Sequence, residues 1–198
     1  MLAIGAVMIV FLAIHGLSSA SRAEERVSVF LEDLTWTELR DEIAGGKTTI
    51  IVPIGGTEQN GPAMALGIHN VRVKALSQKI ALALDNAVVA PVIAYVPEGG
   101  IDPPSSHMQF PGTISITEST FEQVLESASR SFKSAGFKNV VFLGDHGGYK
   151  ANDAHVADKL NREWRATDAR GSRRHFSDVG GRTGVGPDGQ TRERLQVQ

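Results

Sequence analysis

Cysteine is absent from the 198 residues of this sequence. Its absence excludes a disulfide framework and thiolate ligands for a metal ion, so any metal site must use His, Asp or Glu side chains. An excess of charge of one sign is also lacking, since the net charge is -2 at pH 7. No stretch combines basic and aromatic residues as nucleic-acid-binding surfaces do, so we expect no nucleic-acid partner and look for a local site.

Long apolar runs are scarce, and the one that stands out spans residues 2–17. Residues 18–23 follow it and are small except for Arg22, and Glu24 then begins a charged stretch. This is the layout of a secretory signal peptide cleaved after Ala20 or Ala23. A membrane-spanning helix needs about 20 apolar residues, so an uncleaved anchor is the weaker alternative. We therefore expect residues 1–23 to be a signal peptide, and a secreted or periplasmic protein without stable membrane association after leader removal.

The stretch from residue 49 to residue 70 joins an apolar strand to a polar, glycine-rich loop. Residues 49–54 are uncharged and mostly β-branched, as expected of a buried parallel strand. The loop that follows carries Glu58, and His69 comes after a second apolar patch. A carboxylate and an imidazole at the carboxyl end of a buried strand indicate a ligand or catalytic site. The alternative is that both side chains only hydrogen-bond neighbouring loops.

Strands and helices alternate through the rest of the chain. The pattern predicts helices over 34–44, 71–84, 117–135 and 151–164, and strands over 87–95 and 139–145. A long loop over 96–112, rich in proline and glycine, contains His107, and the last strand leads directly into His146. This alternation predicts an α/β domain over 24–164 with a mostly parallel sheet, whose strand ends bring these loops to one edge.

The composition changes after Trp164. Six glycines fall between Gly171 and Gly189, and apolar residues are sparse. Such a segment buries too little surface to fold alone, so we expect residues 165–198 to form a divergent, disordered or loosely attached tail.

The side chains predicted to meet at the sheet edge suit a divalent cation. Glu58, His69 and His146 are the expected metal ligands, with Zn²⁺ as the first expectation and Mn²⁺ as the alternative. Asp145 and His107 are the expected catalytic groups, close enough to orient a ligand or carry a proton. A metal-assisted reaction on a small-molecule substrate is the simplest function for this set.

Three motifs in the sequence resemble those of the creatininase (creatinine amidohydrolase) family. They are PIGGTEQNGP at 53–62, HMQFPGTISI at 107–116 and FLGDHGG at 142–148, in the order of the family. The likeness covers roughly residues 34–164. It implies a three-layer α/β/α domain, often assembled into homo-oligomers, that binds one or two divalent metals and hydrolyses cyclic amides or other C–N bonds outside peptide chains. The family's metal-binding Glu falls on Glu58 and its HGG histidine on His146.

The sequence departs from the family pattern at three positions. Asn60 and Ala63 stand where the family usually has histidines, and His69 stands where it commonly has an aspartate. His69 could take over as a ligand, whereas Asn60 is a poor replacement for an imidazole. Two functions are therefore open: a metal-dependent amidohydrolase, and a catalytically inactive binding or scaffold protein on the same fold.

Overall fold

The computed structural model describes residues 28–177 and 196–197. In chain order the elements are η1 (Leu31–Asp33), α1 (Trp36–Ala44), β1 (Thr49–Ile54), α2 (Ile68–Leu84), β2 (Ala87–Val89), η2 (Ser106–Gln109), α3 (Glu118–Ala135), β3 (Asn139–Gly144), α4 (Lys150–Ser177) and β4 (Gln196–Val197). Within these ranges, no helix has the length and apolar character needed to cross a membrane. The predicted signal peptide lies outside the described residues.

The four strands form one parallel sheet in the order β2-β1-β3-β4. β1 lies between β2 and β3, pairing Thr49 with Ala87 on one side and with Asn139 on the other. The chain leaves β1 towards β2 and then crosses back to β3, so the strand order reverses between β1 and β3. In open α/β sheets ligands bind at the carboxyl ends of the strands at such a reversal.

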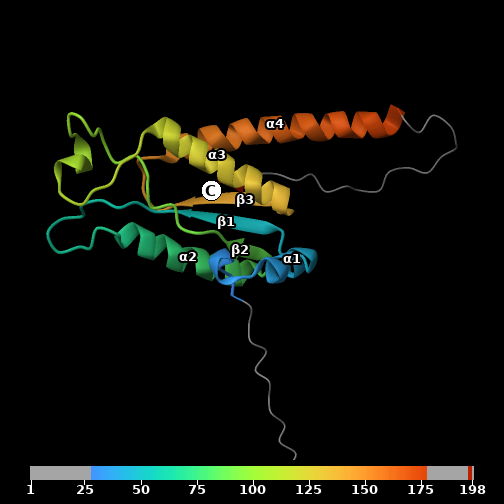
Figure 1. The fold of residues 1–198 in the computed structure, drawn as a ribbon, viewed down its shortest axis with the longest axis horizontal. Helices are drawn as coiled ribbons and strands as arrows, with labels where there is room; N and C mark the ends of the chain where they lie inside the picture. Colours follow the sequence, from blue (N-terminus) through green and yellow to red (C-terminus); the bar gives the residue numbers. More distant parts are fainter. Residues whose placement is uncertain (1–27, 178–195, 198) are drawn as a thin grey trace, which may run out of the picture.

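Helices cover both faces of the sheet (Figure 1). α2 lies on one face, whereas α3 and α4 lie side by side on the other. The loops after β1 and β2 project from the same end of the sheet (Figure 1). The predicted three-layer α/β/α fold with a parallel sheet is confirmed.

Alternate residues of β1 serve the two halves of the core. Ile50 and Val52 belong to the cluster that includes Phe121 of α3, while Ile51 packs with Ala81 of α2. Every residue of β1 is buried, which is why the run lacks charge. Burying each aliphatic side chain contributes roughly 1.5–3 kcal/mol, so this strand anchors the fold.

Capping residues set the ends of the predicted helices. Thr35 precedes α1 and forms a capping box with Glu38, and Thr117 accepts a hydrogen bond from the backbone N of Thr120 at the start of α3. Gly136 ends α3 with a φ of 109°, a left-handed conformation that favours glycine. The predicted helix over 117–135 is thereby confirmed to within a residue.

Three predicted boundaries were wrong. The second strand ends at Val89 rather than at residue 95, because the chain approaches Pro91, which has no N–H for a ladder. α2 begins at Ile68, so His69 lies in its first turn and not in the loop. α4 continues past Trp164 to Ser177, so the helix predicted over 151–164 ends later than expected. The arginines and alanines there are good helix formers, and Gly171 alone does not stop the helix.

Candidate metal centre

Asn70 closes the loop that follows β1. Its Oδ1 accepts a hydrogen bond of 2.9 Å from the backbone N of Gly56, and its Nδ2 donates to Thr57 Oγ1 at 3.2 Å. A Cβ atom at Gly55 would lie 2.1 Å from Asn70 Oδ1, so this approach requires glycine. The loop between residues 56 and 70 is therefore tied to α2 at both ends, with Glu58 near its start.

Glu58 is the centre of a cluster of histidines, although only 2% of it is exposed. Its Oε1 lies 3.0 Å from His69 Nε2 and 3.6 Å from His146 Nε2, while its Oε2 lies 3.0 Å from His107 Nδ1. The backbone N of Glu58 donates to Leu66 O, which fixes the residue at the end of β1. One buried carboxylate thus faces three imidazoles contributed by three separate segments.

His146 follows β3, as the sequence predicts, and its ring is partly exposed. Its Nδ1 accepts a hydrogen bond of 3.2 Å from the backbone N of Gly148, and its Nε2 faces Glu58. A Cβ atom at Gly148 would lie 3.0 Å from Cε1 of the ring. The second glycine of this motif therefore makes room for the imidazole of His146.

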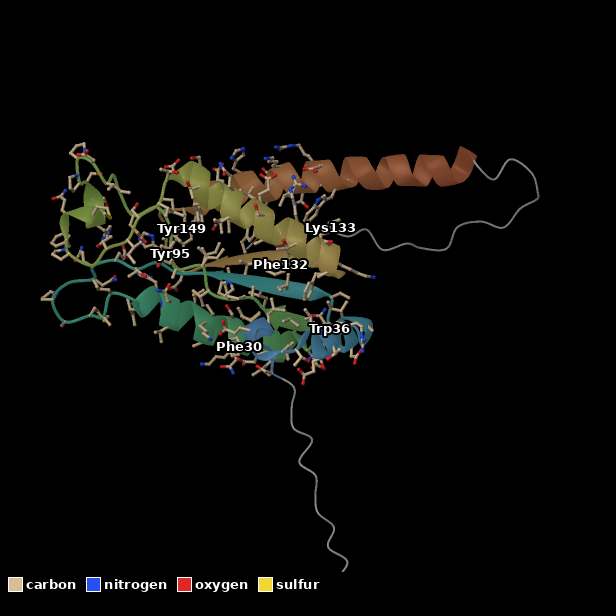
Figure 2. All side chains as sticks on the ribbon, viewed as in Figure 1. Phe30, Trp36, Tyr95, Phe132, Lys133 and Tyr149 are labelled. Atoms are coloured by element: carbon tan, nitrogen blue, oxygen red, sulfur yellow. The ribbon has the colours of Figure 1, made fainter. Side chains whose placement is uncertain are left out.

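The hydroxyl of Tyr149 joins the ends of β1 and β3. It donates to Ile54 O at 2.7 Å and accepts from the backbone N atoms of Asp145 and His146 at 3.2 and 3.1 Å. Burial raises the pKa of Tyr149, so the phenol stays protonated and able to donate. Figure 2 shows Tyr149 at the same end of the molecule as Tyr95. This contact sets the position from which His146 projects.

Asp145 does not face the centre directly, because it binds two basic side chains. Its Oδ2 lies 2.9 Å from His69 Nδ1, and Arg72 Nε lies 2.8 Å from both carboxylate oxygens. His69 therefore bridges two carboxylates, with Nδ1 on Asp145 and Nε2 on Glu58. The side chain of Asp145 orients the imidazole of His69.

Glu98 is a second buried carboxyl group beside Glu58. It is 4% exposed, and neither of its oxygens has a hydrogen-bond partner among the described residues. Burial, together with its contact with the Glu58 carboxylate, raises the pKa of Glu98 to about 8. A Cβ atom at Gly56 would lie 2.5 Å from Glu98 Oε1, so glycine leaves the space that this carboxyl group occupies.

Three of the five predicted site residues could hold one ion together. Ligand atoms of Glu58, His107 and His146 lie within 4.8 Å of one another. Glu58 Oε2 is buried without a hydrogen bond of good geometry, which leaves a lone pair for a cation. One carboxylate and two imidazoles suit a divalent ion such as Zn²⁺ or Mn²⁺. His69 as a ligand stays a prediction, since both of its nitrogens contact carboxylates in this structure.

Comparisons with known proteins give this geometry a context. The family model described as creatininase, creatinine amidohydrolase, matches residues 32–193. The chain belongs to the creatininase family. The match extends beyond residue 164, where the sequence resemblance was expected to end. The creatinine amidohydrolase of Pseudomonas putida is 27% identical over 124 residues, which is 60% of this chain and 45% of that protein.

Other creatininase relatives differ in their named reactions. The mycofactocin precursor peptide peptidase of Mycolicibacterium smegmatis is 36% identical over 104 residues, covering 50% of this chain and 39% of that protein. Among solved structures, a creatininase superimposes with a TM-score of 0.61 at 27% identity, covering 71% of this chain and 54% of that one. A creatininase variant titled "Zn-Zn type" gives a TM-score of 0.64 at 25% identity, covering 72% and 54%. This chain spans less than half the length of the curated relatives it matches.

Sequence reasoning missed two residues of this creatininase site. Tyr149 follows the HGG motif, but its contact with Ile54 depends on how β1 and β3 pair. Glu98 lies in the loop that we singled out for His107, and an acidic residue just after an apolar segment was the available signal. Asn60, at a departure from the family pattern, donates from Nδ2 to the backbone O of Glu58, so it supports the loop.

Proposed function

We propose that this protein is a metal-dependent amidohydrolase that cleaves a cyclic amide or another non-peptide C–N bond of a small molecule. The cluster of Glu58, His107 and His146 supports this function most directly, because its ligand atoms lie within 4.8 Å of one another. Membership of the creatininase family supports the same reaction class. The substrate itself is expected to depend on the loop over 96–112, which lies at the site.

The proposed ligands are those three side chains. A divalent cation held by them would supply Lewis acidity for polarising the bond to be cleaved. We propose Zn²⁺ ahead of Mn²⁺, because zinc accepts mixed imidazole and carboxylate ligands in small coordination numbers. Solved creatininases include a Zn-Zn form and a Mn form.

The remaining groups hold and transfer protons. Asp145 Oδ2 fixes His69 Nδ1, which leaves His69 Nε2 turned towards Glu58 Oε1 and the centre. Arg72 Nε donates hydrogen bonds of 2.8 Å to both side-chain oxygens of Asp145 and so fixes the side chain that orients His69. His107 is partly exposed on its loop and is the group best placed to meet a substrate entering from solvent. In this arrangement His69, which is not among the proposed ligands, would carry the proton that C–N cleavage requires.

Export and assembly complete the proposal. The apolar run over 2–17 supports a leader and a secreted or periplasmic protein, and the family resemblance supports a homo-oligomer. N-terminal sequencing of exported protein tests the first, with a mature chain that begins at residue 21 or 24 as the expected result. Light scattering of the purified protein tests the second.

The deciding experiment measures hydrolysis by protein loaded with Zn²⁺ or Mn²⁺, using creatinine and a panel of other cyclic amides. We expect turnover that is lost on chelation and restored by the metal. The competing function, an inactive binding protein, is favoured by Asn60, whose amide supports the backbone instead of supplying an imidazole. Metal binding with no turnover on any amide would support that second function and contradict the first.

A further inference from the structure

The segment that carries Glu98 is held in place on both sides. Val96 forms a bridge to Ser115, and the backbone N of Glu98 donates to Ser115 Oγ at 3.0 Å. Ser115 Oγ in turn donates to Gly99 O at 2.8 Å. The backbone position of Glu98 is therefore set by these contacts with Ser115.

The carboxyl group of Glu98 lies in an environment that lowers the stability of the fold, because a buried polar group without hydrogen bonds costs free energy. It is almost fully buried, both oxygens lack hydrogen-bond partners in the described part of the chain, and it touches a second buried carboxyl group, Glu58. The charged partners of Glu58 in the described ranges are histidines. Two adjacent carboxyl groups in a poorly solvated site cannot both ionise without a large cost in free energy unless a cation lies between them. Gly56 keeps the space that this arrangement needs.

The charge of the candidate centre also calls for a second carboxylate. Glu58 alone supplies one negative charge against the two positive charges of a divalent ion, since His107 and His146 are neutral as ligands. Glu98 would bring the second negative charge, and with it a set of two carboxylates and two imidazoles. Such a set has hard and borderline donors that suit Zn²⁺ or Mn²⁺.

We propose that Glu98 is a fourth protein ligand of the divalent cation, bound through one of its two unpartnered oxygens. This inference rests on the proposed metal centre. Glu98 is not within 4.8 Å of all three other ligand atoms in this structure, so binding includes a small movement of its carboxyl group towards the ion. Substituting Glu98 should then have opposite effects with and without metal. Glu98→Gln removes a buried acid that lacks hydrogen-bond partners in the described part of the metal-free protein, but it weakens the binding of the ion.

The test compares wild type with Glu98→Gln and Glu98→Asp. Zn²⁺ affinity is measured by competition with a chromophoric chelator, and coordination is followed by the visible spectrum of the Co²⁺-loaded protein. For Glu98→Gln we expect a melting temperature of the metal-free protein equal to or above that of wild type. We also expect Zn²⁺ affinity at least about 10-fold lower and a changed Co²⁺ spectrum. Glu98→Asp keeps a carboxylate and should recover part of the affinity.

Asp153→Asn is the matched control. Asp153 is another acid that is 5% exposed with an oxygen lacking a hydrogen-bond partner, but it lies in α4 and is not part of the ligand cluster. Its amide variant should leave Zn²⁺ affinity and the Co²⁺ spectrum unchanged. If Glu98→Gln binds Zn²⁺ as wild type does, with the same spectrum, Glu98 is not a ligand, while the proposed centre still stands. If wild type binds neither ion, both proposals fail.

Discussion

Two groups of carboxylates in this protein contrast sharply. On the surface between α3 and α4, Arg130 contacts both Glu126 and Glu163, and Lys159 contacts Glu126. Hydrogen bonds from Lys159 and Arg130 lower the pKa of Glu126. At the sheet edge, Glu58 and Glu98 have no lysine or arginine beside them in the described residues, and the pKa of Glu98 is raised. The surface group is neutralised by the chain's own cations.

This difference separates a structural network from a binding site. The α3 and α4 pairs are partly exposed, so solvent screens them and each contributes about 0–1 kcal/mol. The buried pair has little solvent to screen it, so its two carboxyl groups ionise together at low cost only when a cation lies between them. Buried acids with shifted pKa values often indicate a site that binds a ligand of opposite charge.

The largest effect should come from removing the carboxylate that all three histidines face. Glu58→Gln should reduce Zn²⁺ affinity by about 100-fold or more, because it removes a charged ligand at the centre of the cluster. Isothermal titration calorimetry measures this change. Glu126→Gln removes the same charge from the surface network and should leave Zn²⁺ affinity unchanged. Equal Zn²⁺ affinities in wild type, Glu58→Gln and Glu126→Gln would contradict the distinction between the buried acids and the surface network.

Tyr149→Phe tests whether the position of His146 depends on one hydroxyl. The variant loses the three hydrogen bonds of the hydroxyl. Ile54 O and the backbone N of Asp145 keep the hydrogen bond of 3.1 Å between them, whereas the backbone N–H of His146 loses its partner. We expect a loss of about 1–3 kcal/mol in unfolding free energy and about a 10-fold loss of Zn²⁺ affinity. Urea denaturation and metal titration measure the two effects. Tyr95→Phe, at an exposed tyrosine, is the control and should change neither.

His69→Ala sharpens the assignment of ligands. Because His69 Nδ1 and Nε2 both contact carboxylates, we expect the variant to keep one metal ion per chain with an affinity about 10-fold lower. Native mass spectrometry gives the metal count. Complete loss of the ion would make His69 a ligand, as the sequence predicts.

The smallest effect on metal binding is expected for Asp153, an acid outside the centre, whose titration should instead affect the stability of the fold. Burial raises the pKa of Asp153 from 3.8 to about 7. Between these values the folded state binds more protons than the unfolded state, so stability should fall as pH rises from about 4 to about 7 and change no further from this group above that. The shift corresponds to at most about 4 kcal/mol in the free energy of unfolding, measured by denaturation across that range. Asp153→Asn should flatten the profile, and an identical slope in the variant would contradict this assignment.

Local signals predicted much of the fold. β1 matches its predicted range because its uncharged, β-branched residues suit a strand buried on both faces. α3 matches because Thr117 and Gly136 mark its ends. The alternation of strands and helices predicted the parallel sheet, whose strand ends bring Glu58 and His146 to one edge. Composition alone gave a wrong prediction just after Trp164, because the glycine-rich, polar segment was expected to be disordered or loosely attached but continues α4 to Ser177.

The details of the centre depend on contacts between distant segments. That His107 rather than His69 joins the ligand cluster follows from where the 96–112 loop crosses the end of β1, and no spacing encodes this. Glu98 was not predicted as a site residue, because an isolated acidic residue in a loop is normally exposed to solvent. Its burial follows only from Ser115 holding its backbone beside Gly56.

The Asn70 contacts have a consequence for the entropy of binding. Asn70 joins Gly56 across 14 positions, and closing a loop of this length costs about 2 kcal/mol of chain entropy. The protein meets that cost when it folds, as part of forming α2. An arriving ion therefore finds Glu58 already ordered, and Asn70→Ala would move the ordering of the loop into the binding step itself.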